Sequence, residues 1–217
     1  MSTRKSAVSR THYHHGDLRN ALSGAALELA RQGGPEAVVL REAARRVGVS
    51  ATAAYRYFDG QNQLLTEVKR RALGALARIL QESLGECGPA DGSGALAVAR
   101  LTSAAYAYID FAFTEPGLFN TAFCRDQDAA PGDPLEISYD EVNAFQVLGQ
   151  LLDELVAVGL MPPQRRPLAE FAAWSGVHGL AVLFLDGPLR NVVGDERAAA
   201  LEYSVKAIVR SLISPED

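Results

Sequence analysis

The sequence is poor in the residues that build disulfide frameworks, metal centres and membrane spans. It has 2 cysteines, Cys87 and Cys124, which fall in different predicted elements and match no metal or redox spacing. We therefore expect two free thiols in a reducing compartment. No stretch of about 18 uninterrupted apolar residues occurs, and no apolar signal-peptide core follows the basic residues 1–10. These absences predict a cytoplasmic protein that has no membrane contact.

Motifs of enzymes and of cofactor-binding proteins are also lacking. There is no nucleophile motif, no glycine-rich phosphate loop and no recognisable pair of catalytic carboxylates. Cys124 and His178 could be drawn as a nucleophile and its base, yet a free cysteine behaves most often as a small apolar residue. We expect no catalytic residues, no resident cofactor and no metal.

What the sequence does contain is an uneven distribution of charge. The net charge is -5 over 217 residues. Residues 1–59, however, hold nine basic and five acidic side chains, which leaves +4 there and -9 in the remainder. A basic head on an acidic body suits a protein whose one end meets phosphate. The length favours a small head and a larger body in place of one compact domain.

Apolar residues recur at helical spacing along most of the chain, and no strand pattern or internal repeat is present. The predicted fold is all-α, with about nine helices. We expect helices at residues 17–32, 40–47, 51–58, 61–86, 95–114, 116–125, 135–158, 167–185 and 195–213. Three parts follow: a flexible basic arm (1–14), a three-helix helix-turn-helix DNA-binding domain (15–60), and a helical effector-binding and dimerisation domain (61–217).

The second and third predicted helices meet at a tight turn, because Gly48 can end one helix in the left-handed conformation and Ser50 can cap the next. At about 100° per residue, Ala54 and Phe58 share the buried side of the third helix. Three polar side chains then point outward: Thr52, Tyr55 and Arg56. A hydroxyl, a phenol and a guanidinium can all bond phosphate oxygens or base edges.

Residues 14–65 resemble the DNA-binding head of the tetracycline-repressor (TetR/AcrR) family. The resemblance rests on L-R-E-A-A at 40–44, V-G-V-S at 47–50 and A-Y-R-Y-F at 54–58. W-x-x-x-H-G at 174–179 is similar to the WHG type of C-terminal domain in that family. The resemblance implies a homodimeric, DNA-binding transcriptional regulator. Such a protein is expected to be a repressor that leaves a palindromic double-stranded operator when a small molecule binds.

Carried over by position, the resemblance implies a set of DNA contacts. They are Arg41, Ser50, Thr52, Ala53, Tyr55, Arg56, Tyr57 and Gln61. The family commonly has lysine where this chain has Gln61, so we expect an uncharged hydrogen bond in place of an ion pair there. Basic residues of the arm, Arg4, Lys5 and Arg10, could add backbone or minor-groove contacts.

A surplus of aromatic residues in the middle of the body indicates either an ordinary core or a pocket for an apolar or aromatic effector. The candidate effector-binding residues are Tyr106, Asp110, Phe113, Phe119, Phe123, Cys124, Trp174 and His178. No cluster of basic residues faces that region, which argues against a sugar phosphate. The predicted fourth helix is the rigid element shared by head and body, so an effector that swings it would separate the two recognition helices from their grooves.

The last two predicted helices are our expected dimer interface. Small residues on the first let backbones approach closely, and the second carries one apolar stripe. The interface residues are Ser175, Gly176, Gly179, Leu201, Val205, Ile208 and Leu212. Alternatively, this face packs within the monomer.

A metal-responsive regulator is the alternative function, because His12, His14, His15 and Asp17 form a dense ligand-like cluster. Consecutive histidines can coordinate zinc or nickel weakly, yet no second ligand group with a defined spacing occurs elsewhere. These residues otherwise pack or touch phosphate at the edge of the head.

Overall fold

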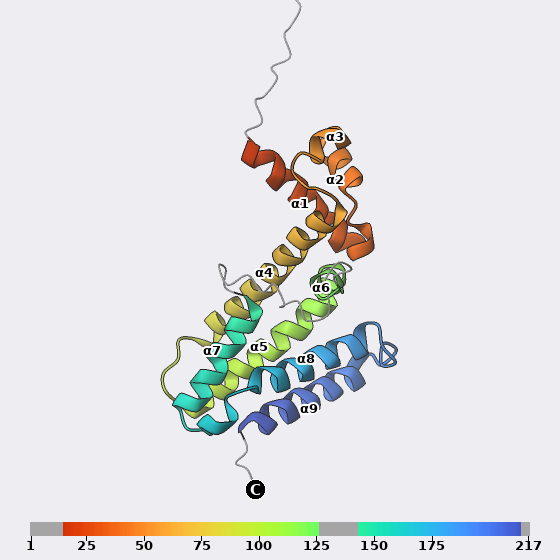
Figure 1. The fold of residues 1–217 in the computed structure, drawn as a ribbon. Coiled ribbons are helices and arrows are strands. Elements are labelled where there is room, and N and C mark those ends of the chain that lie inside the picture. The colour runs from red at the N-terminus through yellow and green to blue at the C-terminus, as the bar shows by residue number, and fades with distance from the viewer. Residues whose placement is uncertain (1–14, 126–142, 214–217) are drawn as a thin grey trace, which may run out of the picture.

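The computed structural model describes residues 15–125 and 143–213, and within these ranges it contains helices and no strand (Figure 1). The α-helices are α1 (His15–Gly33), α2 (Leu40–Val47), α3 (Ala51–Ala54), α4 (Gln61–Cys87), α5 (Gly94–Thr114), α6 (Pro116–Ala122), α7 (Ala144–Ala157), α8 (Ala169–Leu185) and α9 (Gly194–Ile213). Short 3-10 helices lie at Pro35–Ala37 and Pro163–Arg165. The prediction of an all-α chain with about nine helices is confirmed for the described ranges.

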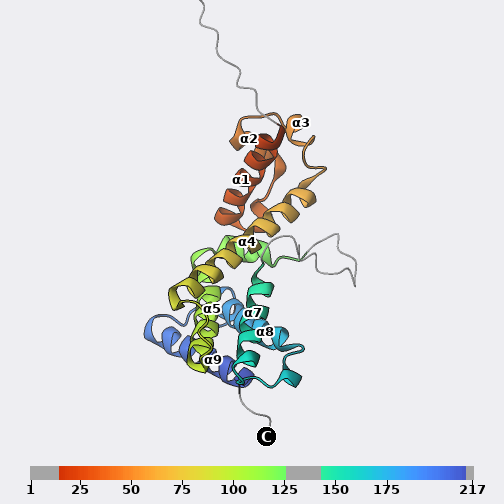
Figure 2. The same cartoon turned by 90° about the vertical axis from the view of Figure 1, so that its left-hand side faces the viewer.

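Helices α1 to α3 form a head at one end of the molecule, and α5 to α9 form a body at the other (Figures 1 and 2). Helix α4 belongs to both. It packs against α1 in the head and against α5, α6 and α7 in the body. Its buried apolar residues continue along its whole length, from Leu64 to Leu84. The hydrophobic core therefore runs from head to body without a break.

The corner between α2 and α3 forms as its sequence predicts. Gly48 has φ 79°, a left-handed conformation that suits a residue without a Cβ, and it ends α2. The Ser50 side chain accepts a hydrogen bond from the Ala53 backbone N–H at 3.2 Å. This bond satisfies one of the free donors at the start of α3.

Helix α3 is shorter than predicted, because it ends at Ala54 and not at Phe58. The backbone N–H groups of Arg56 and Tyr57 bond to carbonyls three residues back, at 3.3 and 2.9 Å. This tighter spacing is typical of a 3-10 turn at a helix end. The face predicted for a regular helix is therefore carried partly by a turn.

Other boundaries differ by smaller amounts. Helix α6 ends at Ala122, where residue 125 was predicted. Helix α7 begins after Asn143, which forms a capping box with Gln146, and the predicted part at 135–142 lies outside the described residues.

Helix α5 is the central helix of the body. It contacts α4, α6, α7, α8 and α9, which explains why it is apolar over most of its circumference. Both cysteines are free thiols, as expected. Among the helices of the described ranges, none combines the length and the apolar composition that crossing a membrane requires.

Candidate nucleic-acid interface and aromatic cluster

The outward face of the third helix and its following turn is polar and exposed, as predicted. Ala54 and Phe58 are fully buried, whereas Thr52 and Arg56 are exposed and Tyr55 is 46% exposed. Burial of the two apolar side chains fixes the rotation of this segment, so the hydroxyl, the phenol and the guanidinium share the outer surface. This is the arrangement that a groove-reading element requires.

The remaining predicted contacts lie around that face. Arg41 in the first turn of α2 and Gln61 at the start of α4 are exposed, whereas Ala53 and Tyr57 are half-buried. Ser50 is exposed, but its side-chain oxygen already caps α3. All eight predicted residues are therefore exposed or half-buried, and Ser50 has a structural role as well.

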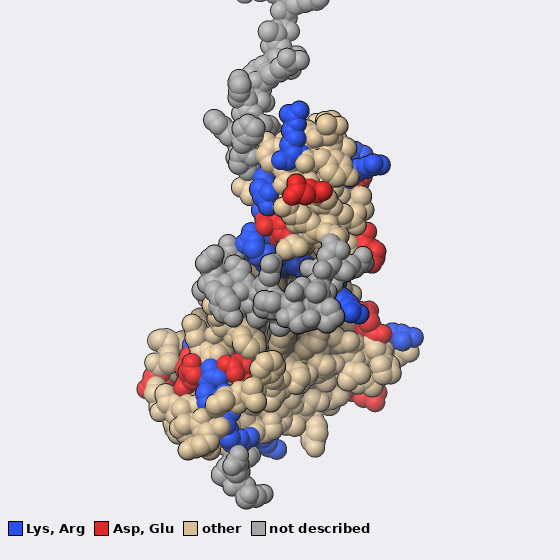
Figure 3. Space-filling view, in the orientation of Figure 1, with Lys and Arg blue, Asp and Glu red and all other residues tan. Residues whose placement is uncertain are grey.

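Basic side chains of the head fall into two groups, and several are visible on its surface in Figure 3. Arg45 forms two hydrogen bonds with Glu42 at 2.7 and 2.8 Å, and Arg46 contacts the same carboxylate at 3.4 Å. The hydrogen bond from Arg45 lowers the pKa of Glu42 to about 2. Among the described residues, neither Arg41 nor Arg56 has an ion-pair or hydrogen-bond partner. The charges of these two are available to phosphate.

Arg19 of α1 holds the turn that follows α3. Its Nη1 donates to the Tyr57 carbonyl at 2.7 Å, and its guanidinium lies over the Phe58 ring, 4.5 Å from the centroid. Tyr57 lies 38 residues further along the chain, so no local pattern indicated these contacts. The sequence indicates Arg19 only as a positive charge, whereas its contacts with Tyr57 and Phe58 make it a positioning residue for Tyr55 and Arg56.

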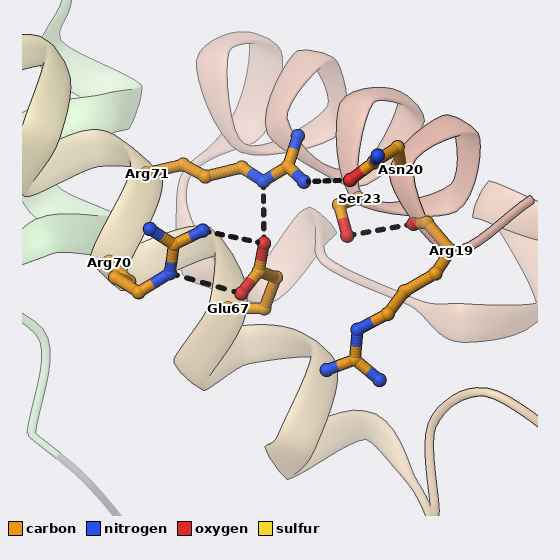
Figure 4. Close-up of polar contacts among 6 residues, drawn as sticks. All are labelled: Arg19, Asn20, Ser23, Glu67, Arg70 and Arg71. Carbon is orange, nitrogen blue, oxygen red and sulfur yellow. Dashed lines mark hydrogen bonds and ion pairs between the residues drawn. The ribbon is translucent and has the colours of Figure 1, made fainter. Parts of the chain in front are cut away.

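A polar network ties α4 to α1 just below the head (Figure 4). Glu67 accepts hydrogen bonds from Arg70 at 3.0 and 3.2 Å and from Arg71 at 2.7 Å, and Arg71 donates to Asn20 of α1 at 3.0 Å. Burial by itself raises the pKa of Glu67, but the two guanidinium groups outweigh it and leave that pKa below its usual value. The carboxylate stays charged and keeps the start of α4 attached to the head.

A second connection joins the head to α6. Arg31 at the end of α1 donates to Glu115 at 2.8 Å. Next to it, a Cβ added at Gly117 would lie 2.3 Å from the Ala30 carbonyl oxygen and 2.5 Å from that of Arg31. Only glycine permits such a close approach of α6 to the backbone of α1. The start of α6 is therefore in direct contact with the backbone of the head.

Helices α5, α6 and α8 meet at an aromatic cluster in the body. We use this name for Tyr108, Phe119, Phe123, Trp174 and His178. The His178 ring is stacked on Phe119 with centroids 5.4 Å apart, and it meets Phe123 edge-on at 4.8 Å. Tyr108 contacts both phenylalanines at 5.9 and 6.1 Å. Tyr108 and Phe119 are buried, and the other three are half-buried.

The polar atoms of the aromatic cluster are joined to one another. The Tyr108 hydroxyl accepts a hydrogen bond from Trp174 Nε1 at 3.1 Å and lies 2.8 Å from His178 Nδ1. Burial raises the pKa of the Tyr108 phenol and lowers the pKa of the His178 imidazole. Both groups are thus uncharged near neutral pH.

Four of the eight predicted effector residues belong to this cluster, and four lie elsewhere. Phe113 lies under Arg197 of α9 at 5.2 Å, and Tyr106, seven residues before it, shares that face of α5. Asp110 is exposed beside a shallow hollow of about 240 Å³ between α4 and α5. The Cys124 carbonyl accepts a hydrogen bond from Lys69 at 2.9 Å. Tyr108, which was not among the predicted residues, occupies the centre.

Some of the expected dimer residues pack within the chain itself, and others are exposed or half-buried. Val205 and Leu212 are buried within the chain itself, at 0% and 4% exposure. A Cβ added at Gly176 would lie 2.9 Å from Ile208 of the same chain, so these two residues join α8 to α9 internally. Ser175 is exposed, while Gly179 and Leu201 are half-buried. The outer sides of α8 and α9 and the ends of α8 carry exposed apolar side chains: Leu168, Phe171, Val182, Leu183 and Tyr203.

The predicted basic arm (Arg4, Lys5 and Arg10) and the His12 and His14 positions lie outside the described residues. His15 and Asp17 begin α1, and their side chains are likewise outside the description. Over the rest of the chain that the structure describes, no group of three His, Cys, Asp or Glu side chains is placed to hold a metal ion.

A three-helix head with an exposed polar recognition segment, joined by one long helix to a helical body, defines a helix-turn-helix regulator. Family models match both parts. The one described as "Bacterial regulatory proteins, tetR family" matches residues 23–68, and "Tetracyclin repressor-like, C-terminal domain" matches residues 101–208, a range that includes the W-x-x-x-H-G segment. The chain belongs to the TetR family of transcriptional regulators.

Solved structures share the fold at low sequence identity. A protein of unknown function from Rhodococcus sp. RHA1 is 23% identical, with a TM-score of 0.73 over 94% of this chain and 100% of its own. The TetR family regulator PfmR from Thermus thermophilus is 21% identical, with a TM-score of 0.56 over 90% and 99%. A TetR variant from Acinetobacter baumannii AYE in complex with minocycline is 18% identical, with a TM-score of 0.56 over 92% and 96%. No curated protein matches the chain.

Proposed function

We propose that this regulator is a homodimeric repressor that binds a palindromic operator and is released when a small apolar or aromatic effector enters the aromatic cluster. The observation that carries the DNA-binding half is the exposed face of Thr52, Tyr55 and Arg56, set beside a second uncommitted guanidinium on Arg41. A short exposed segment with a hydroxyl, a phenol and a guanidinium has the chemistry to contact base edges and phosphates in a major groove.

The exposed apolar side chains on α8 and α9 support the proposed dimer. A twofold axis lets one such face pair with its copy, and Phe171, Leu183 and Tyr203 are 58%, 42% and 78% exposed in the single chain. Val205 and Leu212 then support the interface from inside the chain, since they fix α9 against its neighbours. The dimer presents two recognition segments, so we expect operator half-sites about one helical turn apart.

The aromatic cluster is the proposed effector site because it combines apolar walls with a few polar atoms. The Acinetobacter protein, which shares this fold, is in complex with a small molecule, minocycline. Phe119 lies in the middle of α6 and Phe123 directly follows it, while Gly117 near the start of α6 makes the tight contact with α1. An effector that displaces these rings moves α6, and α4 and α6 together move the head. A coupling of about 1 to 3 kcal/mol between the two sites is enough for release.

We assign no enzymatic activity to the chain. The Nδ1 atom of His178 bonds to Tyr108, so the pairing of Cys124 with His178 as nucleophile and base has no support in the hydrogen bonds of the cluster. The metal-responsive alternative depends on the histidines at 12 and 14, and no observation favours it.

The function is tested by fluorescence anisotropy on DNA from upstream of the chain's own gene. The double variant Tyr55→Ala/Arg56→Ala should weaken binding by at least about a hundredfold, because each lost contact of this kind is worth about 1 to 3 kcal/mol. Arg190→Ala, which removes an exposed arginine of the body, is the matched control and should leave the affinity unchanged. Unchanged affinity of the double variant, with its fold intact by circular dichroism, would refute the proposal.

A further inference from the structure

The hydrogen bonds in the aromatic cluster run in one direction. The indole of Trp174 has a donor and no acceptor, so the Tyr108 oxygen must accept this 3.1 Å bond. The phenol has one proton left to place, and His178 Nδ1 lies 2.8 Å away. A phenol proton directed at that nitrogen satisfies both groups, and Nδ1 is then an acceptor.

The opposite assignment leaves a buried donor unsatisfied. If Nδ1 carried the imidazole proton and donated it to Tyr108, the phenol O–H would need another acceptor. The described residues offer it none, and Tyr108 is only 5% exposed. Buried polar hydrogens without an acceptor are strongly disfavoured. His178 therefore carries its single proton on Nε2.

Within the described ranges, the Nε2–H of His178 is the one polar group of the cluster without a protein partner. Tyr108 is the only hydrogen-bonding partner of His178 among the described residues. Within the same residues, no fully buried side-chain nitrogen or oxygen lacks a partner. The Nε2 atom is therefore not fully buried, and the imidazole that carries it lies against the rings of Phe119 and Phe123.

We propose that the aromatic cluster recognises an uncharged, planar aromatic effector through one hydrogen-bond acceptor, such as a ketone oxygen, which His178 Nε2–H contacts. This inference rests on the proposed function, since it specifies the effector of that same site. A cationic ligand finds no acceptor there, because the free group is a donor. The carboxylate class needs a probe of its own, because the neighbouring Lys69 amine donates to the Cys124 carbonyl at 2.9 Å and keeps its charge.

Three matched probes separate these classes: 2-acetylnaphthalene, 2-ethylnaphthalene and 2-naphthoate. We expect equilibrium dialysis with the full chain to show that the ketone binds about tenfold more tightly than the other two, the gain of one hydrogen bond. His178→Phe should abolish this preference and leave 2-ethylnaphthalene binding intact. Ser103→Ala, which removes a half-buried hydroxyl of α5 outside the cluster, should keep the preference.

The other outcomes overturn the inference in distinguishable ways. Equal binding of ketone and hydrocarbon would show that His178 Nε2–H does not recognise the effector. Tighter binding of naphthoate would show that the effector is not uncharged. If none of the probes binds, the aromatic cluster is not an effector site. Operator binding is measured on the same protein, so discrimination among probes without release from DNA contradicts the proposed function and leaves the inference standing.

The proton position can be tested without a ligand. Long-range proton-nitrogen NMR spectra of the imidazoles distinguish the two neutral tautomers, and the signals of His178 are identified by their absence in His178→Phe. We expect the proton on Nε2 in the wild-type chain. A proton on Nδ1 would overturn the inference, whatever the probes show.

Discussion

The polar side chains of the two candidate sites point in opposite directions, outward in the head and inward in the body. In the head, Thr52, Tyr55 and Arg56 point away from the protein, and buried neighbours serve only to aim them. In the body, Tyr108 bonds to Trp174 and His178, and the rings of Phe119 and Phe123 pack against them. The first arrangement suits a large, charged partner that stays outside. The second suits a small partner that must enter, and it leaves one donor for it.

The largest effect should come from the aromatic side chains that anchor each part. Phe58 and Phe119 are 0% and 1% exposed. Phe58→Ala or Phe119→Ala should lower the free energy of unfolding by about 3 to 5 kcal/mol, because each leaves a cavity. Urea denaturation measures this change, and Val193→Ala, at a 62% exposed site, should alter it little.

Function should then separate the two variants at temperatures where both stay folded. Phe58→Ala removes the support under Tyr55 and Arg56 and should weaken DNA binding. Phe119→Ala should keep DNA binding and lose the ketone preference of the cluster. Equal loss of both activities in both variants would mean that head and body do not divide the work as we describe.

The next effect concerns the joint between the two parts. Gly117→Ala places a Cβ 2.3 Å from the Ala30 carbonyl oxygen, a backbone atom that cannot rotate away. We expect a loss of about 1 to 3 kcal/mol in the free energy of unfolding and a weaker affinity for DNA. The matched control is Gly74→Ala in α4, where nothing lies within 4 Å. There alanine should stabilise the helix by about 0.5 to 1 kcal/mol. If Gly117→Ala changes neither the free energy of unfolding nor the affinity for DNA, the contact of α6 with α1 does not hold the head.

The same contrast explains what could be predicted from the sequence. The recognition face depends on residues within eight positions of one another, so helical periodicity was sufficient to find Thr52, Tyr55 and Arg56. The early end of α3 was not predictable, because Arg19 reaches Tyr57 and Phe58 from α1. The fold class followed from periodicity and helix breakers, which are also local.

The effector site was only half predictable, because it depends on which faces of α5 and α8 meet. Trp174 and His178 are four residues apart and share a face of α8, a signal that pointed to both. Tyr106 and Phe113 also share a face, but it is the face of α5 that lies under Arg197. Tyr108 lies on the opposite side of α5, and only its contact with α8, 66 to 70 residues later, reveals it.

A smaller effect should follow from freeing charge in the head. Glu42→Gln removes the carboxylate that holds Arg45 and Arg46. We expect DNA affinity to rise severalfold at low salt and to fall more steeply as salt increases, because two more guanidinium groups meet phosphate. Glu36→Gln is the control, because it makes the same charge change at an exposed head position that forms no ion pair within the described ranges. An equal response of both variants would assign the effect to net charge alone.

The smallest effect distinguishes the two parts by pH. Burial lowers the folded-state pKa of His178, so below about 6.5 the unfolded chain binds a proton that the folded chain resists. The free energy of unfolding should therefore decline as the pH falls from 7 to 5, and this decline should be shallower in His178→Phe. Glu42 also has a lowered folded-state pKa and loses its contribution in the same sense, but in a lower pH window: with a pKa of about 2, the contribution is present above about 4.5 and is lost only as the pH falls toward 2. Glu42→Gln should thus leave the slope between pH 7 and 5 unchanged. A reversal of these two slopes, measured by urea denaturation, would contradict the contrast between a buried neutral site in the body and an exposed charged one in the head.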